Sequence, residues 1–294
     1  GYDVWMGNAR GNVHSREHEK YDPNTSEYWQ FSWHEIGIFD LPAMIDYILD
    51  VTSEKGVHYI GYSQGCTAFF VMGAERPEYN NKIRSMQALG PAAFLSNTTN
   101  PVIRLTLPML DPLEWSYEWL GVYEFMPDWV MKMLWTMGKT LCDDQSLTQS
   151  ICLQMYFSSG AFTSKQLNST MLPKILSYMP AGASTRQLLH FGQAIRTGTF
   201  RQFDYGQKRN LEYYGQIHPP EYDLAKVTAP VALHWSPNDD FTMLTDVQIL
   251  GSKLGNLIGY FEVSDSSFTH FDFLWANDVH ECLYKKMIEI LRQY

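Results

Sequence analysis

Short apolar runs alternate with amphipathic segments over the first third of the chain. Val57–Gly61 is rich in β-branched and aromatic residues and predicts a buried strand, and Met86–Gly90 predicts another strand. Between them, Ala68–Met72 is apolar throughout, which is typical of a buried helix. A further short strand is predicted over Tyr2–Met6, and the loop Gly7–Asn12 ends it.

A helix is predicted to begin near Asp40. An aspartate can accept main-chain N–H groups at the start of a helix, and Pro42 is tolerated in the first turn. The apolar residues that follow recur at helical spacing. They are Leu41, Ile45, Ile48 and Leu49.

The pattern changes from Ala93 to Val227, where aromatic residues and methionines are dense and prolines break the segment into short helices. Strands and helices then alternate again: Pro230–Trp235 and Leu257–Val263 predict strands, and Asp278–Leu291 predicts a helix. This order predicts an α/β fold with a mostly parallel sheet and a helical insertion. The expected parts are a first core segment (1–92), the insertion (93–227) and a second core segment (228–294).

Length and composition agree with one large α/β domain. The chain has 294 residues, of which 45% are hydrophobic, enough to fill a sizeable core. A net charge of −10 argues against a nucleic-acid partner, which would need a basic surface, and against docking on an anionic membrane. Contact with neutral lipid stays open. The chain contains no apolar run of about 18 residues, so no transmembrane helix is expected.

The cysteines and sequons point to a compartment. The four cysteines form no CxxC pair, which argues against a structural zinc site, and neither metal nor cofactor is expected. Cys142 and Cys152 could close a small disulfide loop in an oxidising compartment. Asn24, Asn97 and Asn168 each begin an Asn-x-Ser/Thr sequon, which favours glycosylation in the secretory pathway over unmodified surface residues.

The sequence Gly61-Tyr62-Ser63-Gln64-Gly65 follows a predicted strand and precedes a predicted helix, the context of a nucleophile elbow. We expect the turn to be too tight for a Cβ at Gly61 or Gly65, and to lift the Ser63 hydroxyl out of the sheet. The Gln64 N–H would then point to where a carbonyl oxygen gains negative charge. The competing interpretation is a glycine-rich turn with an incidental serine.

A serine hydroxyl needs a base, and in this fold the acid and the histidine follow the serine along the chain. Asp239 lies just after the strand predicted to end at Trp235, and His270 lies after the strand predicted to end at Val263. Both loops would fall at the same end of the sheet as Ser63. His270 is therefore the predicted base, and Asp239 would orient it and offset the imidazolium charge.

Three other carboxylates could take the place of Asp239. Asp240 is its neighbour and could be confused with it. Asp246 is expected on or near the next helix, where a carboxylate at the N-terminus is merely stabilising. Asp272 follows His270 too closely to serve as its partner.

The remaining candidate groups have structural explanations. His234 and His58 lie within predicted strands and are expected to be satisfied there. The spacing of His14 and His18 could suit a metal on a helix, but without a third ligand a solvated pair is favoured. Cys66 is expected to be a small buried residue and not a second nucleophile.

Segments along the whole chain resemble signatures of the acid lipase family, the gastric and lysosomal type. They are Gly1–Asn12, Phe39–Asp46, the elbow with Gln64, Pro180–Ser184, Phe203–Gly206 and His270–Trp275. The resemblance implies an α/β-hydrolase fold with a cap and lid over residues 93–227. It also implies a triad of Ser63, Asp239 and His270, an oxyanion donor at Gln64 and a cap disulfide between Cys142 and Cys152.

Neutral lipid esters, either triacylglycerols or sterol esters, are the substrates that the resemblance implies, in a secreted or lysosomal enzyme. A dense set of apolar residues in the insertion fits an acyl pocket or a lipid surface, although such residues could equally form the cap's own core. The set is Leu105, Leu107, Met109, Leu110, Trp115, Trp119, Leu120, Phe125, Met126, Trp129, Met131, Met133, Leu134 and Trp135.

One departure from the family is expected. The family's second oxyanion donor comes from a His-Gly-type loop upstream of the Gly1–Asn12 signature, and its early strands also lie there, so we interpret the chain as N-terminally truncated. The alternatives to a lipid esterase are another hydrolase of the fold, such as a thioesterase or peptidase, and a non-catalytic lipid carrier. A carrier would be expected to have a degraded triad, whereas all three positions here have competent residue types.

Overall fold

A four-stranded parallel sheet organises the molecule. The computed structural model describes residues 1–143, 145–152 and 166–294. The strands follow the order β1 (Val57–Tyr62), β2 (Ile83–Leu89), β5 (Val231–Trp235) and β6 (Leu257–Glu262), and every neighbouring pair is parallel. These correspond to four of the five strands predicted from the sequence, which confirms the mostly parallel sheet of the predicted α/β fold.

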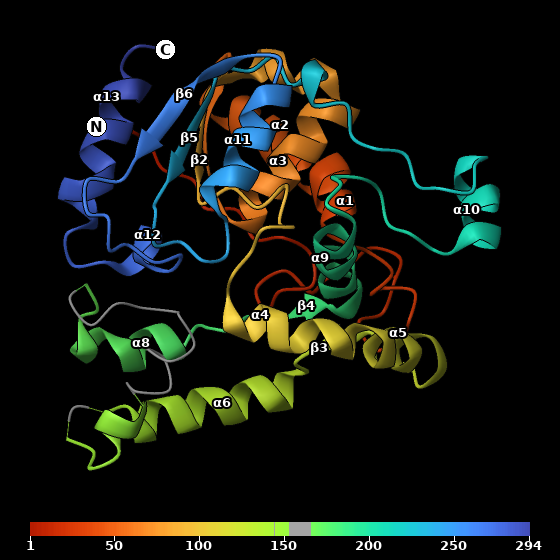
Figure 1. Cartoon of the computed structure of the whole chain (residues 1–294), viewed down its shortest axis with the longest axis horizontal. Coiled ribbons are helices and arrows are strands. Elements are labelled where there is room, and N and C mark those ends of the chain that lie inside the picture. The colour runs from red at the N-terminus through yellow and green to blue at the C-terminus, as the bar shows by residue number, and fades with distance from the viewer. Residues whose placement is uncertain (144, 153–165) are drawn as a thin grey trace.

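Helices cover both faces of this sheet (Figure 1). The larger buried cluster packs α2, α3 and α11 against the strands, with Phe69, Phe70 and Leu250 fully buried. A second cluster packs α12, η6 and α13 on the other side around Phe268 and Phe273. The core helices are α1 (Trp33–Glu35), η1 (Ile36–Asp40), α2 (Leu41–Thr52), α3 (Gln64–Glu75), η2 (Pro77–Lys82), η5 (Leu224–Lys226), α11 (Leu244–Lys253), α12 (Asp272–Trp275), η6 (His280–Tyr284) and α13 (Lys285–Leu291).

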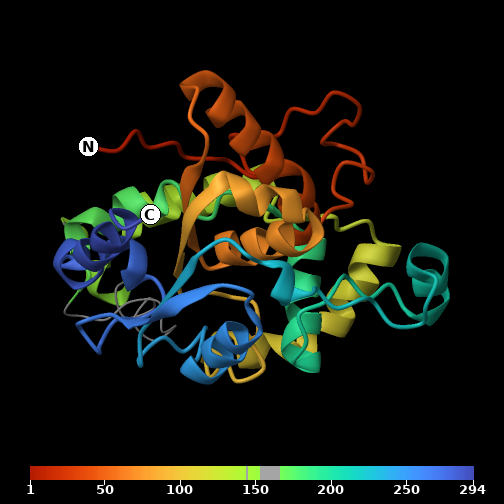
Figure 2. The same ribbon diagram turned by 90° about the horizontal axis from the view of Figure 1, so that it is seen from above.

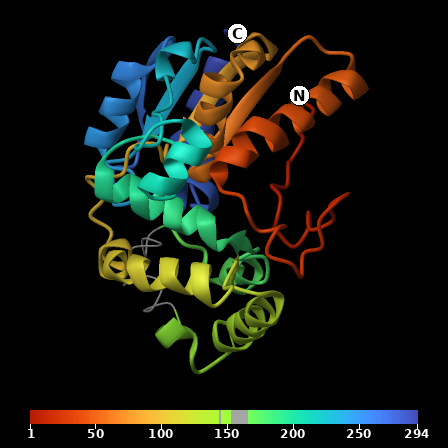
Figure 3. The ribbon, with the colours of Figure 1, turned by 90° about the vertical axis from the view of Figure 1, so that its right-hand side faces the viewer.

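The segment between β2 and β5 forms a layer beneath the carboxyl ends of the strands (Figures 1 and 3). It holds the small antiparallel pair β3 (Glu124–Phe125) and β4 (Ala183–Ser184). Helix α10 projects from the side of the molecule (Figure 2). The helices of this segment are α4 (Pro101–Thr106), η3 (Leu107–Met109), α5 (Leu110–Trp119), α6 (Asp128–Leu141), η4 (Ser169–Met171), α8 (Leu172–Leu176), α9 (Thr185–Thr197) and α10 (Gln207–Tyr214).

Among the residues that the structure describes, no helix is both long and apolar enough to span a bilayer.

Two predictions about strands were wrong. Tyr2–Met6 forms no strand and pairs with none among the described residues, and Val4 is 77% exposed. An extended segment becomes a strand only when a neighbour satisfies its N–H and C=O groups, and β1 instead lies at the edge of the described sheet. For the same reason Val57–Gly61 is not fully buried, since Ile60 is 49% exposed.

The predicted helix is present as α2, which begins at Leu41 with Pro42 in its first turn, but the capping role predicted for Asp40 was wrong. The helical stretch begins at Trp33, where Ser32 and Glu35 form a capping box. Asp40 lies within this stretch and caps nothing. Its carboxylate instead accepts hydrogen bonds from the main-chain N–H of Arg10 at 2.9 Å and from Arg10 Nε at 2.7 Å.

Candidate active site

Ser63 lies at the sharp turn between β1 and α3. Its backbone has φ 50° and ψ −114°, a conformation that a non-glycine residue adopts only under constraint. The Ser63 N–H donates to Leu89 O at 3.0 Å, and the Cys66 N–H donates to Ser63 O at 3.0 Å. These bonds hold the turn, so the Ser63 side chain extends from the carboxyl end of β1.

The glycines of the elbow differ in their roles. A Cβ at Gly61 would lie 3.0 Å from Cys66 N, Gly65 C and Met86 Cε, so the tightness predicted there is confirmed. The same prediction for Gly65 was wrong, because a Cβ there would meet nothing within 4 Å. Gly65 is the second residue of α3, where a side chain would point into open space.

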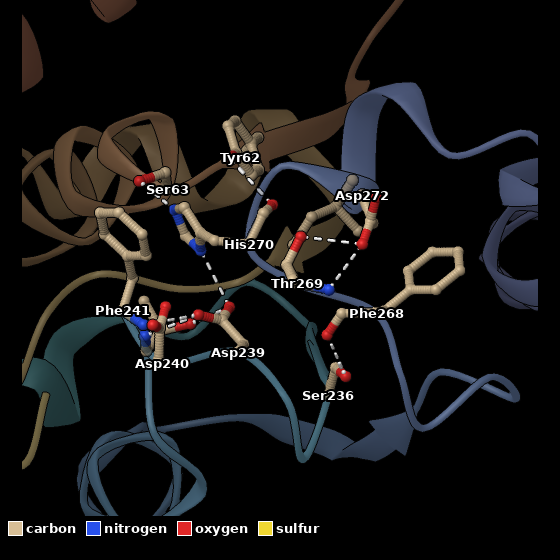
Figure 4. A network of polar contacts seen from close by, with 12 residues as sticks. Tyr62, Ser63, Ser236, Asp239, Asp240, Phe241, Phe268, Thr269, His270 and Asp272 are labelled. Atoms are coloured by element: carbon tan, nitrogen blue, oxygen red, sulfur yellow. Dashed lines mark hydrogen bonds and ion pairs between the residues drawn. The ribbon is translucent and has the colours of Figure 1, made fainter. Parts of the chain in front are cut away.

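His270 connects the serine to a carboxylate. Its loop follows β6, and its Nε2 lies 2.9 Å from Ser63 Oγ. On the other side of the ring, Nδ1 lies 2.8 Å from Asp239 Oδ2 (Figure 4). Asp239 and His270 are both buried. Ser63, Asp239 and His270, which follow three different strands, thus meet at one end of the sheet.

Asp239 is held as a carboxylate by its surroundings. Burial alone would raise its pKa, but His270 and hydrogen bonds from Thr242 outweigh burial and bring the pKa of Asp239 below its ordinary value. Oδ2 accepts the Thr242 hydroxyl at 2.6 Å, and Oδ1 accepts the N–H groups of Phe241 and Thr242 at 2.9 Å each. An ionised Asp239 accepts the His270 Nδ1–H, which leaves Nε2 free to accept the Ser63 hydroxyl proton.

Sequence reasoning missed three residues around this arrangement. Phe241 stacks on the His270 ring at 4.8 Å between ring centres. Thr242 donates to Asp239, as described above. Gly90 directly follows β2, and a Cβ there would lie 3.1 Å from both Asp239 Oδ2 and His270 Nδ1. No sequence signal distinguishes these three residues, because their contacts depend on how the loops fold.

Comparison with known proteins agrees with this architecture. Residues 1–275 match the family described as the alpha/beta hydrolase fold. Lipase 1 of Drosophila melanogaster is 40% identical over 99% of this chain and 64% of its own length. Lysosomal acid lipase/cholesteryl ester hydrolase of Homo sapiens is 35% identical, and gastric triacylglycerol lipase of Bos taurus is 34% identical. Each of these two matches covers 100% of this chain and 72% of the relative. The chain belongs to the acid lipase family.

The family predicted from the sequence signatures is therefore confirmed, and with it the α/β-hydrolase fold. The chain spans just under two thirds of the length of Lipase 1.

The three carboxylates that compete with Asp239 have other partners. Asp240 accepts hydrogen bonds from Asn100 Nδ2 at 3.1 Å on both of its oxygens. Burial raises the pKa of Asp240, and the negative charge of nearby Asp239 raises it further. Asp246, in the first turn of α11, accepts the Asn97 N–H at 3.0 Å. Asp272 accepts the N–H and the hydroxyl of Thr269, both at 2.8 Å.

The other histidines have partners outside the site. His234 is buried and lies 2.9 Å from Gln87 Oε1, and His58 Nδ1 lies 2.9 Å from Ser85 Oγ. His14 and His18 are exposed, and His18 Nδ1 accepts N–H groups of the following turn. Within the described part of the chain, no group of three or more His, Cys, Asp or Glu residues could hold a metal ion. Cys66 is fully buried, as expected, and burial raises the pKa of its thiol.

Gln64 is the first residue of α3, directly after Ser63. The first N–H groups of a helix have no acceptor within the helix, and the helix dipole makes this end attractive to negative charge. The Gln64 N–H thus has the position and polarity of an oxyanion donor.

Cys142 and Cys152 form a disulfide, with their Cα atoms 5.5 Å apart. The bridge is buried beside Leu167, Leu172 and Leu176, next to the end of α6. The sequon residues Asn24, Asn97 and Asn168 are exposed at the surface, and their glycosylation stays a prediction.

Proposed function

We propose that the protein hydrolyses carboxylic esters of neutral lipids, either triacylglycerols or sterol esters. The observation that carries the proposal is the continuous chain of hydrogen bonds from Asp239 through His270 to Ser63, in a member of the acid lipase family. The names of the two mammalian relatives include both triacylglycerol and cholesteryl ester substrates, so both classes are retained.

In the acylation step, His270 Nε2 takes the proton of the Ser63 hydroxyl as Oγ attacks the ester carbonyl. Asp239 stabilises the imidazolium that forms and keeps its ring oriented. The Gln64 N–H donates to the carbonyl oxygen as it gains negative charge. The alcohol then leaves with the proton from His270, and the fatty acyl group stays on Ser63.

In the deacylation step, a water molecule replaces the alcohol. His270 removes its proton, and the resulting hydroxide attacks the acyl carbonyl. The same oxyanion donor acts again, and Ser63 leaves with the proton from His270. The products are one alcohol and one fatty acid for each ester cleaved.

Residues 93–227 would act as a cap with a lid, and their surface supports a lipid-facing role. Trp129, Met133, Met137 and Leu141 recur every four residues along α6, and all four are exposed. Helix α6 lies at the outer side of the layer beneath the sheet (Figure 1). An exposed apolar row of this kind favours contact with a lipid–water interface.

A secreted or lysosomal location is part of the proposal. The Cys142–Cys152 disulfide would form and persist in an oxidising compartment. The exposure of Asn24, Asn97 and Asn168 would allow a glycosylating enzyme to reach them. The relatives include lysosomal and gastric lipases.

A fluorophosphonate probe tests the nucleophile directly. We expect the whole protein to be labelled at Ser63, and Ser63→Ala to abolish both labelling and hydrolysis of emulsified long-chain triacylglycerol or sterol ester. Correctly folded protein that is never labelled would favour a lipid carrier. Labelling combined with turnover of short thioesters alone would favour a thioesterase.

A further inference from the structure

Tyr62 joins the strand of the nucleophile to the loop of the base. It is the last residue of β1 and directly precedes Ser63. Its hydroxyl donates a hydrogen bond of 3.0 Å to the main-chain carbonyl of His270 (Figure 4). The bond therefore reaches the backbone of the residue whose side chain must meet Ser63.

The ring of Tyr62 also contacts the imidazole. Its centre lies 4.9 Å from that of His270, with 34° between the ring planes. The ring of Phe241 contacts the same imidazole at 4.8 Å and 18°. Phe241 is itself fixed, because its N–H donates to Asp239 Oδ1. The imidazole thus contacts one ring from the nucleophile strand and one from the acid loop, which restricts its tilt.

The Tyr62 hydroxyl stays protonated at neutral and acidic pH, so it remains a donor there. Burial raises the pKa of Tyr62 well above its ordinary value, and nearby Asp239 acts in the same direction. Ser236 and Asp272 hold the residues just before His270: the Ser236 hydroxyl donates to Phe268 O at 2.7 Å, and Asp272 accepts from Thr269. Neither of these bonds links the His270 loop to β1, whereas the bond from Tyr62 does.

We infer that Tyr62 is a positioning residue, whose hydroxyl sets the distance between His270 Nε2 and Ser63 Oγ by tethering the His270 main chain to β1. The inference rests on the proposed function, in which a proton passes between those two atoms once in acylation and once in deacylation. An error of about 1 Å in such a contact can cost on the order of 100-fold in rate. A tether that removes part of this freedom therefore acts on the rate of serine attack and not on the binding of lipid.

The test variant is Tyr62→Phe, which removes the hydroxyl and keeps the ring. The reaction measured is labelling by a fluorophosphonate, in which Ser63 Oγ bonds to phosphorus, fluoride leaves and His270 takes the hydroxyl proton. We expect complete labelling with a rate constant on the order of tenfold lower than in the wild type. Ester hydrolysis should show a similar fall in kcat with an unchanged KM.

Tyr214→Phe is the matched control, since the Tyr214 hydroxyl donates to Phe203 O at 2.9 Å, away from the site. We expect it to lower the melting temperature about as much as Tyr62→Phe and to keep the wild-type labelling rate. The final extent of labelling gives the number of folded sites, and the rate constant is measured on those sites. Partial misfolding of Tyr62→Phe would therefore lower the extent and leave the rate constant measurable.

Two results would overturn the positioning role while leaving the proposed function intact. One is labelling of Tyr62→Phe at the wild-type rate. The other is a lower extent of labelling with an unchanged rate for each reactive site, as a merely structural bond would give. A folded wild-type protein that is not labelled would overturn the proposed function itself, and the inference with it.

Discussion

Gly90 lies where a side chain would enter the site. Its φ is +52°, in the left-handed region that favours glycine. A Cβ would approach Asp239 Oδ2 and the Cε1 and Nδ1 atoms of His270 to 3.1 Å each. The bond between Asp239 and His270 is only 2.8 Å long and both residues are buried, so neither partner can move without weakening the other's contacts.

We therefore expect Gly90→Ala to displace the His270 ring. Hydrolysis should fall on the order of 100-fold for a displacement near 1 Å. The free energy of unfolding should fall by about 1–2 kcal/mol, because alanine in the left-handed region is strained. The measurements are kcat for ester hydrolysis and the midpoint of urea unfolding.

Gly215→Ala separates strain from displacement. Gly215 has φ +71°, and a Cβ there would meet nothing within 4 Å. Its alanine variant should lose a similar amount of stability and keep wild-type activity. Equal activity of the two variants would show that Gly90 does not control the geometry of the base.

The sequence allowed Ser63, His270 and Asp239 to be proposed together because each residue type suits its task and each follows a predicted strand. Tyr62, Phe241 and Gly90 could not be found in this way. Their contacts with His270 join segments far apart in the chain, and a tyrosine, phenylalanine or glycine in or next to a loop after a strand is common without such a role.

At the scale of elements, Ser184 fixes the start of α9. It forms a capping box with Gln187, and its hydroxyl accepts the Arg186 N–H at 3.0 Å. The same hydroxyl donates toward Trp29 O at 3.0 Å and Phe31 O at 2.7 Å. One buried side chain therefore caps a helix and attaches it to the N-terminal loop.

Ser184→Ala should destabilise the protein more than a simple cap does. Loss of a cap costs about 1 kcal/mol, and removing the Ser184 hydroxyl from the Phe31 carbonyl adds about 1–3 kcal/mol. The Trp29 carbonyl keeps the Phe31 N–H as a donor at 2.8 Å. Urea unfolding should therefore show a total loss of about 3 kcal/mol in the free energy of unfolding. Ser177→Ala, which removes the hydroxyl of a half-buried side chain that bonds to Lys174 O in its own turn, is the control and should change stability by less than about 0.5 kcal/mol. Equal effects would contradict the dual role.

The elements themselves were predictable where a pattern had one interpretation. The apolar strands were long enough to be recognised. The Gly61–Gly65 motif also placed the boundary between β1 and α3 correctly. Asp40 failed as a cap because its better partner, Arg10, lies 30 residues earlier. Tyr2–Met6 failed because a strand depends on a neighbour, which a local pattern does not contain.

At the scale of the whole molecule, buried histidines make the free energy of unfolding depend on pH. His234 lies in the sheet beside Gln87, and His190 lies between Ser32 and the carbonyl of Arg201. Burial lowers the pKa of each to about 3. Both are therefore neutral in the folded protein at pH values where the unfolded chain would bind a proton, because an unperturbed histidine has a pKa of about 6.5.

The stability that neutral His234 contributes is complete above about pH 6.5 and is lost as the pH falls toward its folded pKa of about 3. We expect His234→Gln to be less stable than the wild type at pH 7, because the core is repacked. The gap should narrow on acidification, by at most about 1.4 kcal/mol for each pH unit below 6.5, because glutamine takes up no proton on unfolding. Urea unfolding at pH 7, 6, 5 and 4 measures the gap. His14→Gln, at an exposed position, should follow the wild-type curve, and a gap for His234→Gln that is constant with pH would contradict the argument.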